Sequence, residues 1–248
     1  MSEMRTFFKY VIPSILSFAL SGIYAIVDGF FVGHSVGDMG LSAINVAYPV
    51  SAVLQAVGTG IGIGGAVYYS ISSAEGREKR ARDYTAATLW ILMISSVLLT
   101  ALAFCFNAPI LRLLGAEGEL LSLGAEYNQI IALGAGLQIL STGLVPFIRN
   151  YGGPLYAMMS MVAGFITNVV LDYLFVWVFG QGLAGAALAT ILGQGVTLLF
   201  ALVYFLHRKM FTLRIGLSGL KNLSGSVIKV GISPFGLTMT PNISLIII

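Results

Sequence analysis

Long apolar stretches alternate with short polar breaks along most of the 248 residues. A helix needs about 20 apolar residues to cross a bilayer, because it rises ~1.5 Å per residue through roughly 30 Å of hydrocarbon. Six complete stretches meet that length, at residues 7–32, 41–71, 84–106, 120–148, 155–179 and 182–206. A seventh begins near Val227 and is still apolar at Ile248. The pattern predicts an all-α polytopic membrane protein.

The spacing of these stretches divides the chain into three segments. We expect a six-helix transmembrane lobe over 1–206, a cytoplasmic linker over 207–226, and the start of a seventh helix over 227–248. The seventh stretch opens like the first, since Lys9 precedes Pro13 much as Lys229 precedes Pro234. A second copy of the six-helix unit would explain this, and a chance similarity of two helix starts is the alternative. We therefore expect the first half of a twelve-helix, two-lobe protein.

Composition supports the membrane assignment. The chain is 57% hydrophobic and 9% charged, with a mean hydropathy of +0.92, whereas soluble domains carry about 25% charged residues. The basic pI of about 9.0 does not indicate nucleic-acid binding, because the basic residues are scattered over connecting segments.

The basic residues also predict which way the chain faces. With a cytoplasmic N-terminus, twelve of the thirteen fall on the cytoplasmic side and only Arg112 falls outside. The twelve are Arg5, Lys9, Arg77, Lys79, Arg80, Arg82, Arg149, Arg208, Lys209, Arg214, Lys221 and Lys229. Because Lys and Arg concentrate in cytoplasmic loops, we expect a multi-pass protein of the cell membrane with its N-terminus inside.

Two carboxylates, Asp28 and Asp172, lie inside apolar stretches. A charged side chain near the bilayer midplane costs at least ~2.5–3.5 kcal/mol and usually faces a cavity or an ion. We therefore interpret both as functional, in an ion-coupled transporter. The alternative for Asp28 is a hydrated position at the outer mouth, since Gly33 and His34 follow closely. Pro13 on the same helix removes a backbone hydrogen bond and predicts a bend point.

Further oxygen donors surround these carboxylates in the predicted helices. Asn168 and Asp172 are four residues apart, so both project from one helix face. Hard cations prefer oxygen ligands and a buried carboxylate readily accepts a proton, so either Na⁺ or H⁺ fits this pair. An Asn–Asp hydrogen bond that joins helices is the structural alternative. Thr190 could add a hydroxyl oxygen, although bonding to its own helix is the commoner use.

Nothing in the sequence indicates an enzyme. It has no nucleophile elbow, phosphate loop or histidine cluster. Five glycines between 58 and 65 mimic a nucleotide-binding loop, but no strand precedes them, so helix packing explains them better. We expect no cofactor beyond the coupling ion.

Taken together, the motifs resemble those of the multidrug and toxic compound extrusion family, in the branch named for a DNA-damage-inducible member. The resemblance rests on Pro13 with Asp28-Gly-Phe-Phe-Val-Gly33, on the segment 164–175 that contains Asn168 and Asp172, and on Gly185-Ala-Ala-Leu-Ala-Thr190. Arg149 followed by Gly153-Pro154 also fits. The match covers nearly the whole chain but only the first of the family's two lobes.

The resemblance implies alternating access driven by H⁺ or Na⁺, with export of organic, often cationic, compounds. It implies a cation site formed by Asp28, Asn168, Asp172 and Thr190, which would also hold Na⁺ if sodium is the coupling ion. It further implies that Tyr127 lines the same cavity and that Pro13 is the bend point of the first helix. The expected partners are the lipid bilayer, small organic substrates and the second lobe.

Two other functions are weighed against this one. A lipid-linked oligosaccharide flippase of the same superfamily would often carry basic residues in its central cavity, whereas every Lys and Arg here is predicted at a loop or helix end. A non-transporting membrane scaffold gives no reason to keep two carboxylates within the membrane.

Overall fold

The computed structural model describes the backbone of residues 2–247. It leaves out the side chains of 2, 3, 5, 6, 9, 14, 17, 18, 20–22, 24, 25 and 241–247, so the expectations placed on Arg5 and Lys9 lie outside the described side chains. Over the described range the chain is helical apart from short turns and the segment 208–216, and it contains no strand. The all-α prediction is confirmed.

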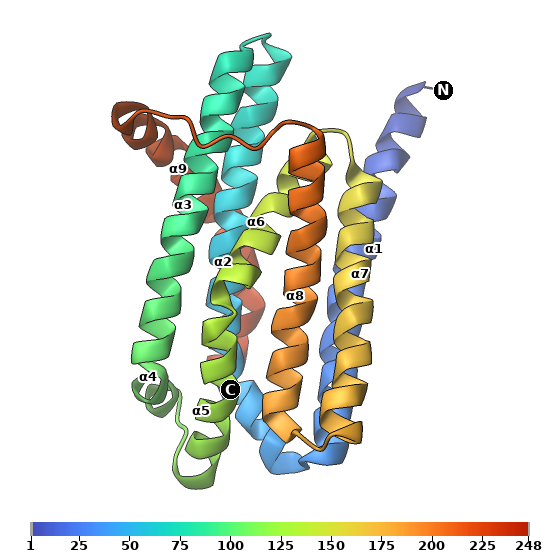
Figure 1. The fold of residues 1–248 in the computed structure, drawn as a ribbon, viewed down its shortest axis with the longest axis vertical. Helices are drawn as coiled ribbons and strands as arrows, with labels where there is room; N and C mark the ends of the chain where they lie inside the picture. Colours follow the sequence, from blue (N-terminus) through green and yellow to red (C-terminus); the bar gives the residue numbers. More distant parts are fainter. Residues whose placement is uncertain (1, 248) are drawn as a thin grey trace.

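The helices form an elongated bundle in which most run parallel or antiparallel to one another (Figure 1). Their bounds are α1 Ser2–Ser35, α2 Asp38–Ala74, α3 Glu78–Cys105, α4 Asn107–Leu113, α5 Gly118–Leu133, α6 Ala135–Asn150, α7 Pro154–Asp172, the π-helix η1 Tyr173–Val178, α8 Gly182–His207 and α9 Leu217–Ile247. Helix α2 packs against α3, α6 and α9, which makes it the central helix of the bundle.

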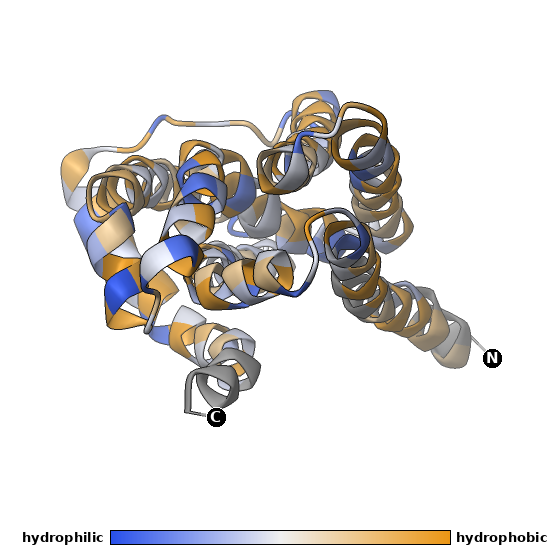
Figure 2. Ribbon diagram, turned by 90° about the horizontal axis from the view of Figure 1, so that it is seen from below, coloured by the Kyte–Doolittle hydropathy of each residue, from blue (hydrophilic) through white to orange (hydrophobic). Residues whose placement is uncertain are grey.

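Four described helices, α2, α3, α7 with η1, and α8, are long and apolar enough to cross a membrane, and the bent pair α5–α6 is a fifth. Figure 2 shows that hydrophobic residues dominate the helices seen along the bundle. Exposed apolar side chains such as Ile94, Val97 and Leu199 cover the outside. An apolar outer surface is what a bilayer requires of a helical bundle.

The fourth predicted span, 120–148, is two helices in the structure. Helices α5 and α6 meet at Gly134 with a bend of 55°. Glycine is needed there because an added Cβ would lie 2.6 Å from the Cβ of Ile191 on α8. The bend lets Ile191 pack into the inner corner, and hydrophobic periodicity alone does not reveal it.

Other boundaries also differ from the sequence expectations. The polar break expected after the third span contains the short helix α4, and the fifth span ends in η1. The linker expected over 207–226 is shorter, because α9 already begins at Leu217. Lys229 therefore lies twelve residues inside α9, which corrects the expectation that every basic residue sits at a loop or helix end.

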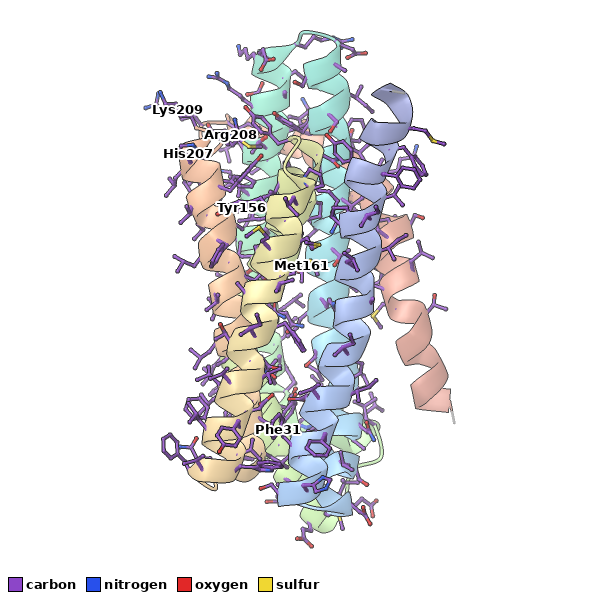
Figure 3. The ribbon with its side chains drawn as sticks, turned by 90° about the vertical axis from the view of Figure 1, so that its right-hand side faces the viewer. Phe31, Tyr156, Met161, His207, Arg208 and Lys209 are labelled. Carbon is purple, nitrogen blue, oxygen red and sulfur yellow. The ribbon has the colours of Figure 1, made fainter. Side chains whose placement is uncertain are left out.

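The connections group at two ends of the bundle. The start of α1 and the turns after α2, α6 and α8 lie at one end, which we call the basic end because it carries Arg77, Lys79, Arg208 and Lys209. The turn between α1 and α2, the start of α5 and the turn before α8 lie at the opposite end (Figure 1). Figure 3 shows Arg208 and Lys209 at the basic end and Phe31 of α1 near the other.

Candidate functional site

Helix α1 packs lengthwise against α7 and η1, and this pairing brings Asp28 and Asp172 together. Next to them an aromatic contact fixes the two helices: the rings of Phe31 and Trp177 are edge to face, with centroids 5.0 Å apart. Edge-to-face geometry suits the ring quadrupoles and adds to the apolar contact. The carboxyl groups of Asp28 and Asp172 lie within electrostatic reach of each other, and Asn168 lies within reach of Asp172. Three of the predicted site residues therefore converge.

Several buried polar atoms of this cluster have no hydrogen-bond partner outside it; within it, the side chains of Asp28 and Asp172, and those of Asp172 and Asn168, lie close enough to bond to each other. The atoms without an outside partner are Oδ1 of Asp28, both carboxylate oxygens of Asp172, and Oδ1 and Nδ2 of Asn168. Asn168 and Asp172 are fully buried and Asp28 is 8% exposed. A buried polar group without a partner costs about 1–3 kcal/mol, so a group of them is unfavourable unless another species completes it.

No basic side chain that the structure describes compensates the two carboxylates. Among the described side chains the ion pair is Arg77–Glu75, at the basic end and far from this cluster. The phenol of Tyr48 on α2 lies within electrostatic reach of Asp28. Two acidic groups thus share a buried, uncharged surrounding, where one added positive charge would relieve their mutual repulsion.

The α7–α8 contact positions Asn168 and Thr190. The two helices run antiparallel and approach closely where Gly164 faces Gly193 and Thr197. Gly193 also faces Asn168, since a Cβ added to Gly193 would lie 3.0 Å from the Cβ of Asn168. Because the helices are antiparallel, Thr190, three residues before Gly193, lies level with the turn between Asn168 and Asp172. Thr190 is half-buried.

Two further residues predicted from the sequence, Tyr127 and Pro13, are also located in the structure. Tyr127 is buried on α5, nine residues from the start of that helix at the end opposite the basic one. Tyr48 and Thr190 lie ten and eight residues from the same end of α2 and α8, and Asp28 lies seven residues from that end of α1. Pro13 is buried in α1, which continues as a helix through it. Its role as a bend point stays a prediction.

Two features of the site, and a polar residue one helical turn from Thr190, were missed from the sequence. Tyr48 carries no local signal, because it follows an apolar run and only the folded structure brings it to Asp28. Gln194 lies four residues after Thr190 and accepts a hydrogen bond from Ser141 at 2.7 Å. That spacing repeats the Asn168–Asp172 pattern and could have been found. The π-helix beginning at Tyr173 widens the backbone immediately after Asp172, a distortion that is frequent at functional sites.

These residues fit a small cation. Carboxylate and amide oxygens are the ligands that Na⁺ prefers, and either carboxylate can take up a proton instead. The described chain holds no group of three or more His, Cys, Asp or Glu residues that would suit a transition metal. The oxygen donors of the cluster are of the kind that a small, hard cation or a proton prefers.

Comparison with known proteins shows the family to which the chain belongs. The family model described as MatE matches residues 13–174. The multidrug export protein MepA of Staphylococcus saprophyticus is 30% identical over 243 residues, which cover 94% of this chain and 52% of that protein. The chain spans about half the length of the curated relatives it matches.

Two solved structures have nearly the same similarity to this fold. One is described as the inward-facing conformation of a multidrug resistance MATE family transporter of the MOP superfamily; its TM-score is 0.81 at 25% identity, covering 94% of this chain and 55% of that one. The other is described as the outward-facing conformation of such a transporter; its TM-score is 0.82 at 26% identity, covering 93% and 52%.

Proposed function

Because the chain belongs to the MatE family of membrane transporters, we propose that it forms the first lobe of a cation-coupled antiporter that exports organic, often cationic, compounds. One observation carries the coupling: Asp28 and Asp172 are buried close together, with no hydrogen-bond partner outside the cluster and no basic partner among the described side chains. Such a pair is incomplete without a positive charge. In this proposal Asn168 and Thr190 complete the cation shell.

The same pair explains how an ion gradient can drive a conformational change. A ligand shifts a two-state equilibrium only by its different affinity for the two states. Two neighbouring carboxylates repel each other when both are charged and stop doing so when a proton or Na⁺ is bound. Because Asp28 is on α1 and Asp172 is on α7, this change acts on the contact between two helices. Pro13 on α1 would let the helix bend in response.

The two-lobe part of the proposal rests on the comparisons. Helix α9 follows the non-helical segment 208–216 and would be the first helix of the second lobe. The described lobe has nearly equal TM-scores against inward- and outward-facing transporters. This equality supports a mechanism in which the lobe keeps its fold while the two lobes move. The basic end would face the cytoplasm, as Lys and Arg normally do.

Transport by the complete protein in proteoliposomes tests the proposal. An inward-directed H⁺ or Na⁺ gradient, imposed separately, should drive export of ethidium, a fluorescent organic cation. Asp172→Asn keeps the side-chain volume but removes the negative charge, so we expect transport to fall at least about tenfold with insertion unchanged. Asp38→Asn, the same chemical change at an exposed position, should transport normally. Wild-type rates in Asp172→Asn would contradict ion coupling through this carboxylate.

A further inference from the structure

Helices α2 and α9 approach each other so closely at one place that backbone atoms of one helix face backbone atoms of the other. A Cβ added to Gly231 of α9 would lie 2.5 Å from the carbonyl oxygen of Gly60 on α2. A Cβ added to Gly60 would lie 2.8 Å from the carbonyl oxygen of Gly231, and one added to Gly64 would clash with the carbonyl oxygen of Val227. The two helices therefore touch over one full turn with no room for a single methyl group.

This face of α2 is separate from the faces that hold the six-helix lobe together. Gly58 and Gly62 face α6, and Gly65 faces Thr88 of α3. Gly60 and Gly64 are four residues apart and form a face of their own, which α9 occupies. In a bilayer, where helices gain little by hiding apolar surface from lipid, such small-residue faces let backbones pack closely.

The contact lies toward the basic end. Gly64 is ten residues from the end of α2 at Ala74, roughly 15 Å along the helix axis. Val227 is equally far from the start of α9 at Leu217. The carboxylate cluster lies in the other half, since Asp28 is seven residues from the end of α1 at Ser35. The close contact and the candidate cation site thus occupy opposite halves of the bundle.

We propose that this contact, between Gly60 and Gly64 of α2 and Val227 and Gly231 of α9, is the seal that closes the interface between the two lobes at the basic end, and that it separates when the transporter opens there. The inference rests on the proposed function in taking α9 as the first helix of the second lobe. Val227 and Gly231 are buried against α2, whereas Ile228 and Ile232 are 49% and 63% exposed. The apolar side chains of Ile228 and Ile232 are therefore left for lipid or the second lobe, while the backbone of Val227 and Gly231 makes the close contact with α2.

A seal of backbone against backbone has a physical consequence. The dispersion attraction between two packed atoms decreases steeply with their distance. A gap of about 0.5–1 Å therefore loses a quarter to a half of the attraction of each contact. The closed state is therefore sensitive to one added methyl group. The segment 208–216 is held to the lobe by the buried side chain of Met210 and by the hydrogen bond from Nε1 of Trp90 to the carbonyl oxygen of Leu213, 3.1 Å, and neither contact involves the glycines of α2.

Distance measurements in the complete transporter test the seal. Lys79 and Asn222 line one cavity of about 690 Å³ between the α2–α3 turn and the start of α9, and both are exposed. Spin labels on cysteines at these two positions should report a short distance when the seal is closed. Gly231→Ala should raise the ratio of long to short distances at least about fivefold, because overpacking disfavours the closed state.

Gly236→Ala is the matched control. It makes the same change on the same helix, but nothing lies within 4 Å of the added Cβ, so the distances should match wild type. An unchanged distribution in Gly231→Ala, or an equal shift in Gly236→Ala, would overturn the inference.

A second measurement avoids glycine substitutions, in case Gly231→Ala fails to insert. Joining cysteines at Lys79 and Asn222 with a short, reductively cleavable bis-maleimide linker should hold the seal closed. We expect ethidium transport to drop at least about tenfold and to recover on cleavage. Full transport by the linked protein would show that the contact need not open. Absence of ion-driven transport in the unlinked protein would instead contradict the proposed function, while the distance comparison would still decide the inference.

Discussion

At the scale of single residues, the site differs from other buried polar positions in the hydrogen-bond partners of its side chains. Asn128 on α5 is a buried amide held by another residue, because its Nδ2 donates to Oδ1 of Asn107 at 2.8 Å, although its Oδ1 has no partner. Asn168 is equally buried, yet its amide has no hydrogen-bond partner outside the acidic cluster, where Asp172 is within reach. Since a buried amide without a partner lowers stability by about 1–3 kcal/mol, the free energy given up at Asn168 is consistent with a ligand-binding role.

Leucine substitutions at the two asparagines should therefore act in opposite ways. Asn168→Leu removes an amide that no residue outside the cluster satisfies and keeps the volume, so we expect thermal stability to be equal to or above wild type while cation affinity falls roughly tenfold or more. Asn128→Leu leaves Oδ1 of Asn107 without its donor, while Nδ2 of Asn107 keeps its bond to the carbonyl oxygen of Ala125, and it should lower the unfolding free energy by about 1–2 kcal/mol without changing cation affinity. Thermal unfolding of the purified protein, with and without Na⁺ and over a range of pH, measures both. A loss of stability in Asn168→Leu equal to that in Asn128→Leu would indicate a purely structural amide.

The residues of this site were predictable to different degrees. Asp28 and Asp172 are visible from the sequence because charge is costly in an apolar stretch, and Asn168 follows from its spacing to Asp172. Tyr48 was not predictable, because its relation to Asp28 exists only once α1 and α2 are packed. Which residues of two neighbouring helices face each other depends on how the helices are shifted along their axes and on close contacts such as that between Gly164 and Gly193. A single sequence does not determine this shift.

At the scale of helices, glycine decides where the bundle departs from straight spans. Apolar length correctly indicated spans near α2, α3 and α8. It did not reveal the bend between α5 and α6, because hydrophobicity continues unbroken through Gly134. It also placed the start of α9 ten residues late, because residues 217–226 are too polar to be recognised as part of a span although they are helical.

The bend at Gly134 can be tested with a neighbouring glycine as control. Gly134→Ala places a methyl group against the side chain of Ile191, and we expect a loss of about 1–3 kcal/mol in unfolding free energy. Gly136→Ala adds the same methyl group 3.8 Å from Ser96, an ordinary contact, and should be neutral or slightly stabilising through helix propensity. Thermal unfolding of the two variants in the same detergent compares them. Equal stability of the two would mean that Ile191 does not depend on the bend.

At the scale of the whole molecule, the two ends of the bundle differ in charge. The turns after α2 and α8 carry Arg77, Lys79, Arg208 and Lys209, whereas Arg112 on α4 lies at the other end. Cysteines placed at Lys79 and Lys221 should react with a membrane-impermeant maleimide only after the cytoplasmic side is exposed. A cysteine at Asp38 should react in intact cells. Labelling of the Lys79 position in intact cells would reverse the orientation and put the proposed seal on the outer side.

The central claim is that Asp28 and Asp172 form one shared site for the coupling cation. Cation movement is measured directly in proteoliposomes as ethidium is transported the other way, with an internal pH dye for H⁺ and radioactive sodium for Na⁺. Residues that act as a unit are strongly non-additive. Asp28→Asn and Asp172→Asn should therefore each abolish the cation flux, and the double variant should be no worse than either. Cation flux that persists in step with ethidium in either single variant, or losses that simply add in the double variant, would contradict a shared site.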